Sequence, residues 1–248
     1  MIEVRGLVKH YGTIHAVDDV SFTVGRQEIV AIVGDNGAGK STLVKMLAGA
    51  VSPDAGEIRV EGSDRRFRSP NDARGAGIEM LYQDLALLPN LDVTMNLYLG
   101  RESTVGPRWL FGVLARNRMR REAKEHLHDL QINIPNLWGT PVALLSGGQR
   151  QSVAIARALV WASKLVIMDE PTAALGVAQS QAVLELTQRI RERGTSVILI
   201  SHILPHVLEL ADRILVMRHG HKVADLPSTE LTQDQLIELI VGYRRSAA

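Results

Sequence analysis

A glycine-rich segment holds the residues whose types and spacing most directly suggest chemistry. Residues 34–41 read Gly-Asp-Asn-Gly-Ala-Gly-Lys-Ser. Glycines let the backbone curl so that several N–H groups converge on phosphate oxygens, and a helix start beside them adds partial positive charge. A lysine at this spacing reaches the outer phosphates of a nucleotide, and the following hydroxyl takes a position on Mg²⁺. The segment therefore predicts a site for a nucleoside triphosphate and its magnesium ion.

Each residue of this segment receives an expected role. We expect Lys40 to contact the β and γ phosphates, Ser41 to bind Mg²⁺, and Thr42 to direct its hydroxyl to the α-phosphate. The alternative is a glycine-rich turn between a strand and a helix with an exposed lysine, which this segment alone leaves open. The predicted nucleotide-binding residues are Gly34, Asp35, Asn36, Gly37, Ala38, Gly39, Lys40, Ser41 and Thr42.

Two acidic residues end an apolar run in the second half of the chain. Residues 165–168 are all apolar, which predicts a strand buried on both faces, and Asp169 and Glu170 follow directly. Ligands of open α/β sheets bind at the carboxyl ends of the strands. We expect Asp169 to hold Mg²⁺ through water and Glu170 to polarise the attacking water as the general base. The alternative is an acidic strand end that caps the next helix.

A second possible phosphate site lies between these two segments. Residues 145–151 read Leu-Ser-Gly-Gly-Gln-Arg-Gln and precede an expected helix. Two glycines before a helix allow the backbone to approach an anion, and the helix dipole favours that anion. The first glycine-rich segment can already surround most of a triphosphate. A second phosphate-binding segment in the same chain therefore requires a separate explanation. The alternative is a helix cap, with Ser146 as the N-cap residue and Gln149 completing a capping box.

Regular apolar patterns predict the elements that position these residues. Residues 2–8, 16–24 and 28–33 alternate as β-strands do, and a helix is expected from Lys40 onward. From Gln149, helices and strands alternate, which is typical of a mostly parallel sheet covered by helices. These later elements are helices 150–162, 179–193 and 232–241 and strands 164–169, 195–201 and 214–217.

The middle of the chain has a different pattern. Residues 70–140 contain helical pieces, a loop-like insert at 101–116 and a charged helix at 117–131. We interpret this region as a helical subdomain inserted into a single domain that spans residues 1–248. The expected boundaries assign 1–83 and 141–248 to the core and a β-subdomain, and 84–140 mainly to the helical subdomain.

The composition excludes several classes of function. The net charge of +1 gives no electrostatic argument for nucleic acid as a partner, and the absence of cysteine excludes disulfides and thiolate metal sites. Neither a secretory signal nor a transmembrane span is visible, because Arg157 and Lys164 interrupt the most apolar stretch short of ~20 residues. A protein of this kind that serves a membrane must dock on another subunit.

The histidines do not suggest a metal site by their spacing. His126 and His128 lie two residues apart, so they do not share a helix face. His219 and His221 flank a glycine in an expected turn between strands. No further ligands stand at a spacing typical of zinc sites.

Together, the three phosphate-related segments resemble those of the ATP-binding-cassette ATPases, the motor subunits of ABC transporters. The resemblance covers nearly the whole chain. It implies an α/β P-loop NTPase fold of the ABC type, with a mostly parallel core sheet, an antiparallel β-subdomain and a helical subdomain. It also implies an ATPase that binds ATP and Mg²⁺ and converts ATP and water to ADP and phosphate.

The resemblance assigns roles to three further residues. It makes Gln83 a contact to Mg²⁺ and the attacking water, His202 a contact to the γ-phosphate that braces Glu170, and Tyr11 the aromatic residue that stacks on adenine. It also implies that two copies of the chain pair head to tail. The signature residues Ser146, Gly147, Gly148 and Gln149 of each copy then close on the ATP of the other.

One position departs from the family pattern. Gly176 stands where the family more commonly has an aspartate that couples the two ATP sites. The branch of carbohydrate importers is similar to this chain at that position. The details of coupling between the sites are therefore in doubt, whereas ATP binding is not.

Four segments resemble bacterial importers of ribose-, xylose- or fructose-type monosaccharides: Phe67–Pro70, Leu85–Leu88, Asn96–Glu102 and Glu170–Gly176. This resemblance implies a homodimer bound peripherally at the cytoplasmic face of the bacterial inner membrane. Its partners would be integral-membrane permease subunits and, indirectly, an extracytoplasmic sugar-binding protein, with no nucleic acid. The alternatives are an exporter subunit, an importer of another solute, and a soluble ABC protein without a transport role.

Overall fold

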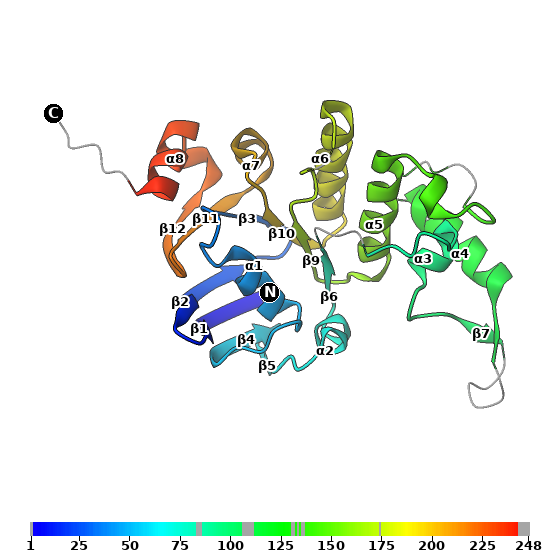
Figure 1. Cartoon of the computed structure of the whole chain (residues 1–248), viewed down its shortest axis with the longest axis horizontal. Coiled ribbons are helices and arrows are strands. Elements are labelled where there is room, and N and C mark those ends of the chain that lie inside the picture. Colours follow the sequence, from blue (N-terminus) through cyan, green and yellow to red (C-terminus); the bar gives the residue numbers. More distant parts are fainter. Residues whose placement is uncertain are drawn as a thin grey trace.

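Two large β-sheets, a short two-stranded hairpin and a set of helices make up the described part of the molecule (Figure 1). The computed structural model describes residues 2–82, 86–105, 112–129, 132, 134, 137–173 and 175–242. A central sheet has the strand order β12-β11-β3-β10-β9-β6, and an antiparallel sheet has the order β2-β1-β4-β5. The α/β fold class expected from the sequence, with its parallel core and antiparallel β-subdomain, is confirmed.

The central sheet is parallel except at one edge. Strands β11, β3, β10, β9 and β6 pair in parallel, and β12 pairs antiparallel with β11. Every residue of β3, β9 and β10 is buried, as the continuous apolar runs predict for strands covered on both faces. The six strands are β3 (Ile29–Val33), β6 (Ile78–Leu81), β9 (Leu165–Asp169), β10 (Ser196–Ile200), β11 (Arg213–Arg218) and β12 (His221–Pro227).

One face of the central sheet packs on helix α1 (Lys40–Leu47) and the antiparallel sheet. Alternate strand residues such as Val30 and Ile32 share a core with Leu43 and Leu47 of the helix. Because these side chains are fully buried, each stabilises the fold by about 1.5–3 kcal/mol relative to exposure. The strands of the antiparallel sheet are β1 (Ile2–Tyr11), β2 (Ile14–Val24), β4 (Ala55–Val60) and β5 (Ser63–Arg65).

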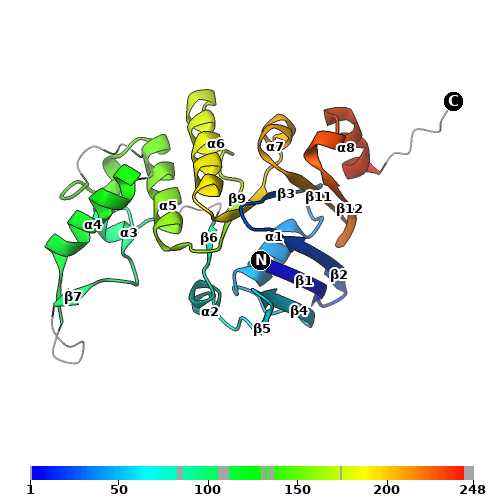
Figure 2. The same ribbon diagram turned by 180° about the vertical axis from the view of Figure 1, so that it is seen from behind.

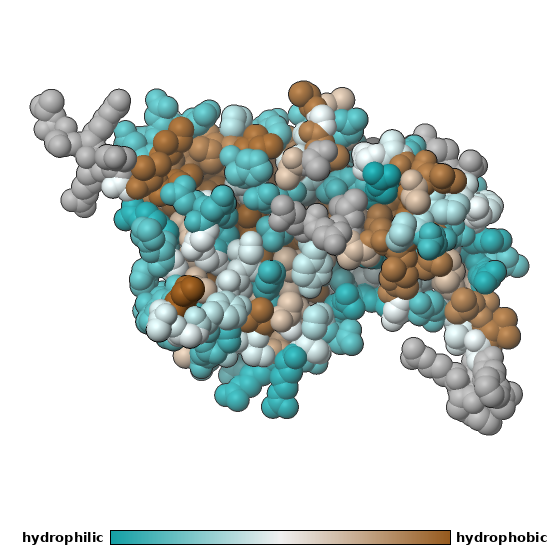
Figure 3. Space-filling model, in the orientation of Figure 1, coloured by the Kyte–Doolittle hydropathy of each residue, from teal (hydrophilic) through white to brown (hydrophobic). Residues whose placement is uncertain are grey.

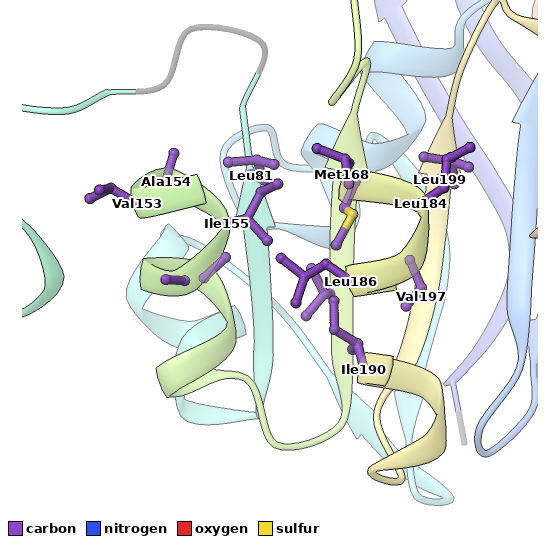
Figure 4. Close-up of a cluster of buried hydrophobic side chains, with 14 of the residues drawn as sticks. Leu81, Val153, Ala154, Ile155, Met168, Leu184, Leu186, Ile190, Val197 and Leu199 are labelled. Atoms are coloured by element: carbon purple, nitrogen blue, oxygen red, sulfur yellow. The ribbon is translucent and has the colours of Figure 1, made fainter. Parts of the chain in front are cut away.

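The other face of the central sheet is covered by four helices (Figure 1). Figure 4 shows Ile155 of α5 and Leu186 of α6 pointing toward Leu81 and Met168 of the sheet. The four helices are α5 (Gly147–Trp161), α6 (Val177–Glu192), α7 (Leu204–Leu210) and α8 (Gln233–Val241). None of the helices in the described part of the chain combines the length and the apolar character that crossing a bilayer requires.

The described residues from 93 to 129 form one end of the molecule (Figures 1 and 2). Earlier in the middle region, residues 78–81 instead form β6 of the central sheet, and the helix at residues 70–75 contacts that strand. The expected charged helix is α4 (Arg116–Asp129), and the expected loop-like insert contains the short hairpin of β7 (Thr104–Val105) and β8 (Val113–Leu114). The predicted boundary between residues 83 and 84 falls outside the described residues and stays a prediction. The remaining helices of the middle region are α2 (Pro70–Gly75) and α3 (Val93–Leu97), and the short 3-10 turns lie at Val142–Leu144 and Ser228–Glu230.

The hairpin of β1 and β2 is longer than the sequence pattern indicated. The strands continue to Tyr11 and resume at Ile14, so only two residues turn the chain. Gly12 has a φ of 60°, a conformation that suits glycine and permits this tight turn. The extension matters because it moves Tyr11 from a loop onto the end of a strand.

Asn96 organises the segment before and around α3. It is fully buried, its Oδ1 accepts from the Leu88 N–H at 2.8 Å, and its Nδ2 lies 3.1, 3.2 and 3.0 Å from the carbonyl oxygens of Leu88, Leu91 and Asp92. Replacing Asn96 with alanine leaves these buried groups without partners. We expect Asn96→Ala to reduce the free energy of unfolding by about 2 kcal/mol or more.

Denaturant unfolding of wild type and Asn96→Ala measures this effect. Asn71→Ala, which removes the same side chain from an exposed position on α2, is the matched control and is expected to change stability little. Equal stability of wild type and Asn96→Ala would show that the buried network does not hold this segment.

Candidate functional site

The glycine-rich segment forms a loop between β3 and α1. Gly34, Gly37 and Gly39 have φ angles of 147°, 80° and 98°, which a side chain rarely adopts. A Cβ on Gly34 would collide with the carbonyl oxygen of Met217, and one on Gly39 with that of Ala16. The glycines are therefore needed both for the turn of the backbone and for its packing against two other strands.

Lys40 lies at the start of α1 and folds back over the loop. Its Nζ donates to the carbonyl oxygens of Gly34 at 2.6 Å and Asp35 at 2.8 Å. Burial lowers the pKa of Lys40, and the nearby carboxylates of Glu170, Asp35 and Asp169 oppose this shift. These two hydrogen bonds hold the amine over the loop, and a bound anion could take the place of the two carbonyl oxygens as its partner.

The acidic pair lies where the sequence placed it, at the carboxyl end of β9. Asp169 is buried, and Ser41 hydrogen-bonds to its carboxylate. Burial and the neighbouring Glu170 carboxylate raise the pKa of Asp169, while Lys45, Ser41 and Lys40 oppose the shift. A hydroxyl beside a carboxylate whose charge is incompletely compensated is a donor set that suits Mg²⁺.

The raised pKa of Asp169 predicts a change in stability. When its pKa is higher in the folded than in the unfolded protein, a carboxyl group destabilises the fold while it is ionised. This destabilisation disappears as the pH falls from the folded-state pKa to the unfolded-state value of ~3.9. At pH 7.5 we therefore expect Asp169→Asn to raise the melting temperature of the nucleotide-free protein by roughly 2–4 °C. Thermal unfolding at pH 7.5 and pH 4.5 tests this, and the gain should shrink at the lower pH.

A melting temperature lowered by Asp169→Asn at pH 7.5 would contradict this account of its charge. Glu192→Gln is the matched control, because it removes a carboxylate from an exposed position near the end of α6. The control should not show the same dependence on pH.

Glu170 has an unusual backbone conformation for its residue type. Its φ is 51°, and its N–H donates to the carbonyl oxygen of Ile200 at 2.9 Å. A non-glycine residue in this region stores strain that the surrounding structure must hold in place. The carboxylate is about a quarter exposed, with Oε1 3.4 Å from Nδ1 of His202, which follows β10. The parallel pairing of β9 and β10 therefore brings together Glu170 and His202.

The segment of the second glycine pair begins helix α5. Ser146 is the N-cap residue, its hydroxyl accepts from the Gln149 N–H at 3.3 Å, and the Gln149 Oε1 accepts from the Ser146 N–H at 2.9 Å. The capping box weighed as an alternative is therefore present. The cap leaves space at Gly147, where a Cβ would meet nothing within 4 Å. Gly148 instead packs against Gln179 of α6.

One buried polar contact, which the sequence analysis did not identify, ties α5 to the acidic pair. The Nε2 of Gln151 donates to the carbonyl oxygen of Pro171 at 2.7 Å, and Gln151 is buried. A glutamine at an inward-facing helix position was the available signal, because a buried amide needs a partner. The contact fixes the loop after Glu170 relative to the helix that begins at Gly147.

The two glycine segments lie on different parts of the central sheet. The loop with Lys40 follows β3, whereas α5 packs beside β6 at the sheet edge (Figure 1). Strands β10 and β9 lie between β3 and β6. At the usual distance between neighbouring strands, β3 and β6 are therefore roughly 14 Å apart. Both views of the ribbon place α5 away from α1 (Figure 2). The structure therefore does not bring both segments to one triphosphate within a single chain.

Tyr11 lies at the end of β1, on a hairpin that touches the phosphate loop. Its side chain is 48% exposed, and the Nζ of Lys9 stands 5.6 Å from its ring centroid. The carbonyl of Ala16 packs against Gly39, which places the hairpin beside the loop. An exposed aromatic ring at this position can stack on a flat ligand.

Gln83 and Gly176 complete the set of residues singled out from the sequence. Gln83 lies outside the described residues. Gly176 is the N-cap residue of α6, and its Cβ position is next to the Oε1 of Gln179, the side chain that also packs against Gly148. The substitution of glycine for aspartate thus falls beside the signature helix.

Comparisons with known proteins show what this chain is similar to. A family model described as ABC transporter matches residues 17–173, which include all three phosphate-related segments. The chain is 46% identical to the fructose import ATP-binding protein FrcA of Rhizobium meliloti, over 98% of this chain and 95% of that protein. It is 42% identical to the xylose/arabinose import ATP-binding protein XylG of Sulfolobus acidocaldarius, over 98% and 94% of the two chains.

A solved structure shares the fold along almost its whole length. It is a nucleotide-free ATP-binding cassette from an ABC transporter, 25% identical to this chain with a TM-score of 0.82. The alignment covers 99% of this chain and 96% of that one.

Proposed function

This chain belongs to the ABC transporter family as an ATP-binding cassette, and we propose that it hydrolyses ATP to drive monosaccharide import through a separate membrane permease. The observation that carries the proposal is the assembly of the Lys40 loop and the acidic pair of Asp169 and Glu170 at the carboxyl ends of β3 and β9, two parallel strands with β10 between them. We infer the class of solute from the fructose and xylose/arabinose import ATP-binding proteins, to which the chain is similar along its length.

ATP would bind with its phosphates in the glycine-rich loop. Lys40 would exchange its two carbonyl contacts for the β and γ phosphates, and the N–H groups at the start of α1 would complete the cradle. Ser41 and Asp169 would hold Mg²⁺, with Gln83 as a further contact. The ion neutralises charge on the phosphates. The residues from Gly34 to Thr42 would form the nucleotide site, with Tyr11 stacking on the adenine.

Glu170 is the residue that we assign as the general base. Its partly exposed carboxylate would accept a proton from the attacking water. Glu170 follows directly on Asp169, the last residue of β9. His202, 3.4 Å away, would orient this carboxylate and contact the γ-phosphate. Both residues come from adjacent strands, so the rigid sheet maintains their separation.

Completion of the site would need a second copy of the chain. The signature residues Ser146 to Gln149 lie away from the phosphate loop of their own chain, and the start of α5 leaves Gly147 open. We propose that they close on the ATP of the partner in a head-to-tail dimer. Exposed Leu144 and Val177, 76% and 91% accessible, flank the signature and the acidic loop and would be covered in that dimer.

The helical end of the molecule would contact the permease. Figure 3 shows apolar side chains among polar ones at this end, and the exposed ones include Leu99, Val105 and Val113. An import ATP-binding subunit of this family lies at the membrane periphery, here at the cytoplasmic face of the bacterial inner membrane. An extracytoplasmic binding protein would select the sugar for the permease.

Uptake of a panel of labelled monosaccharides by host cells tests the proposed function. Cells carrying Glu170→Gln should lose uptake of one sugar that wild-type cells take up, and fructose, xylose, arabinose and ribose are the first to test. Cells carrying Glu192→Gln should behave as wild type. Unchanged uptake of every sugar, with the variant protein present at normal level, would overturn monosaccharide import.

A further inference from the structure

Two histidines and an aspartate gather on the hairpin of β1 and β2, outside the residues assigned to ATP. His10 and His15 are cross-strand partners, and their ring centroids lie 4.0 Å apart. Asp18, further along β2, completes the group, with one ligand atom from each of the three side chains within 4.8 Å of the others. Neither the nucleotide site nor the proposed dimer uses these residues.

The distances within this histidine–aspartate group suit a metal ion. The Nδ1 of His15 lies 3.7 Å from Oδ2 of Asp18. Ligand atoms around a four-coordinate zinc ion lie roughly 3.3 Å apart, so a small rotation of the side chains would close the group on an ion. His15 is 59% exposed and Asp18 is 35% exposed, which leaves both free to rotate and open to solvent.

A third imidazole reaches the same carboxylate from another strand. The Nε2 of His221, at the start of β12, is 3.7 Å from Oδ2 of Asp18, and its Nδ1 lies 3.1 Å from the backbone oxygen of Asp18. The backbone supports this approach, because the Asp18 N–H donates to the carbonyl of Gly220 at 2.9 Å. His221 is therefore placed to supply a fourth ligand.

One imidazole nitrogen of the group lacks a partner. The Nε2 of His10 is inaccessible to solvent and has no hydrogen-bond partner among the described residues. A buried nitrogen without a partner costs stability unless a ligand satisfies it. The nearest positive charge on the same strand is already paired, because the Nζ of Lys9 donates to Asp54 at 2.7 Å. The group therefore presents a carboxylate and imidazoles to a cation.

We propose that His10, His15 and Asp18, with His221 as a fourth ligand, bind a divalent transition-metal ion such as Zn²⁺. Neutral imidazole and carboxylate are ligands that such ions accept, whereas Mg²⁺ prefers oxygen ligands. The bound ion would link the β1–β2 hairpin to the start of β12. It would thereby fix the end of the hairpin that carries Tyr11, the residue next to His10.

Zinc binding by the purified full-length chain, free of any histidine tag and of nucleotide, tests this site. Competition with a chromophoric chelator at pH 7.5 should show one bound equivalent per chain in the presence of excess Mg²⁺. His15→Ala and Asp18→Asn should each weaken Zn²⁺ binding about tenfold or more. The double variant His126→Ala/His128→Ala, which removes one half-buried and one exposed imidazole from α4, should bind as wild type.

A second measurement separates loss of the site from loss of the fold. Ring signals of the eight histidines can be followed by ¹⁵N NMR, and Zn²⁺ should shift those of His10 and His15 while leaving His126 and His128 unchanged. Zn²⁺ should also raise the melting temperature of wild type more than that of Asp18→Asn. Equal Zn²⁺ affinity of wild type, His15→Ala and Asp18→Asn, or absence of a bound equivalent, would overturn the proposed site.

Discussion

Replacing Glu170 with glutamine is expected to reduce ATP turnover by about 100-fold or more, while binding of MgATP remains close to normal. Glutamine has the shape of glutamate and cannot accept the proton of the attacking water. The N–H at this position, where φ is 51°, donates to the carbonyl oxygen of Ile200, and the substitution leaves that backbone bond in place. The substitution should therefore change the chemistry and leave the nucleotide cradle intact.

Steady-state phosphate release and equilibrium binding of MgATP separate these two effects for Glu170→Gln. Because the nucleotide persists, the variant should also accumulate as a dimer in MgATP, which light scattering detects. Glu192→Gln makes the same change at an exposed position and should hydrolyse ATP as wild type. Normal turnover by Glu170→Gln would remove Glu170 as the base.

Lys40→Ala is expected to act at the earlier step and weaken nucleotide binding. The amine makes charge-assisted contacts to the outer phosphates, so its loss should cost about 2–3 kcal/mol, a decrease in affinity of roughly 30- to 150-fold. The fold should survive, because the hydrogen bonds that Lys40 makes in the structure go to carbonyl groups of its own loop, at Gly34 and Asp35.

Titration with a fluorescent ATP analogue in Mg²⁺ measures this affinity. Lys124→Ala on the exposed face of α4 is the matched control, because it removes an equal charge far from the loop. Tight MgATP binding by Lys40→Ala would contradict the assignment of the glycine-rich segment as the phosphate cradle.

The sequence was most informative where local chemistry decides the structure. Gly34, Gly37 and Gly39 predict a curled loop because other residues rarely adopt their φ angles. The apolar run before Asp169 predicts a buried strand, because a strand that is covered on both faces needs apolar side chains on both. These features depend on a few adjacent residues, so their spacing alone located the strand, the loop and the helix start.

Contacts between distant segments could not be predicted in this way. The bond from Gln151 to Pro171 and the group of His10, His15 and Asp18 depend on which strands and helices become neighbours. The histidine spacing did not suggest a metal site, because the ligands come from two paired strands. The strand order of the sheet determines such contacts. Hydrophobic periodicity indicates where strands and helices occur, and it does not indicate the order of the strands in the sheet.

The two glycine segments of one chain lie on different parts of the central sheet. The loop with Lys40 and the start of α5 at Gly147 should act on the same ATP only when they come from different copies of the chain. Gly147→Asp disables the signature without steric conflict in its own chain, since a Cβ there meets nothing within 4 Å. Lys40→Ala disables the phosphate cradle.

Mixing the two inactive variants tests whether the signature of one copy acts on the ATP of the other. A mixed dimer would combine the intact loop of Gly147→Asp with the intact signature of Lys40→Ala, and so restore one complete site. Random pairing should return up to about a quarter of wild-type ATPase activity. If mass spectrometry confirms mixed dimers and the mixture stays as inactive as each variant alone, the signature does not act on the partner's ATP.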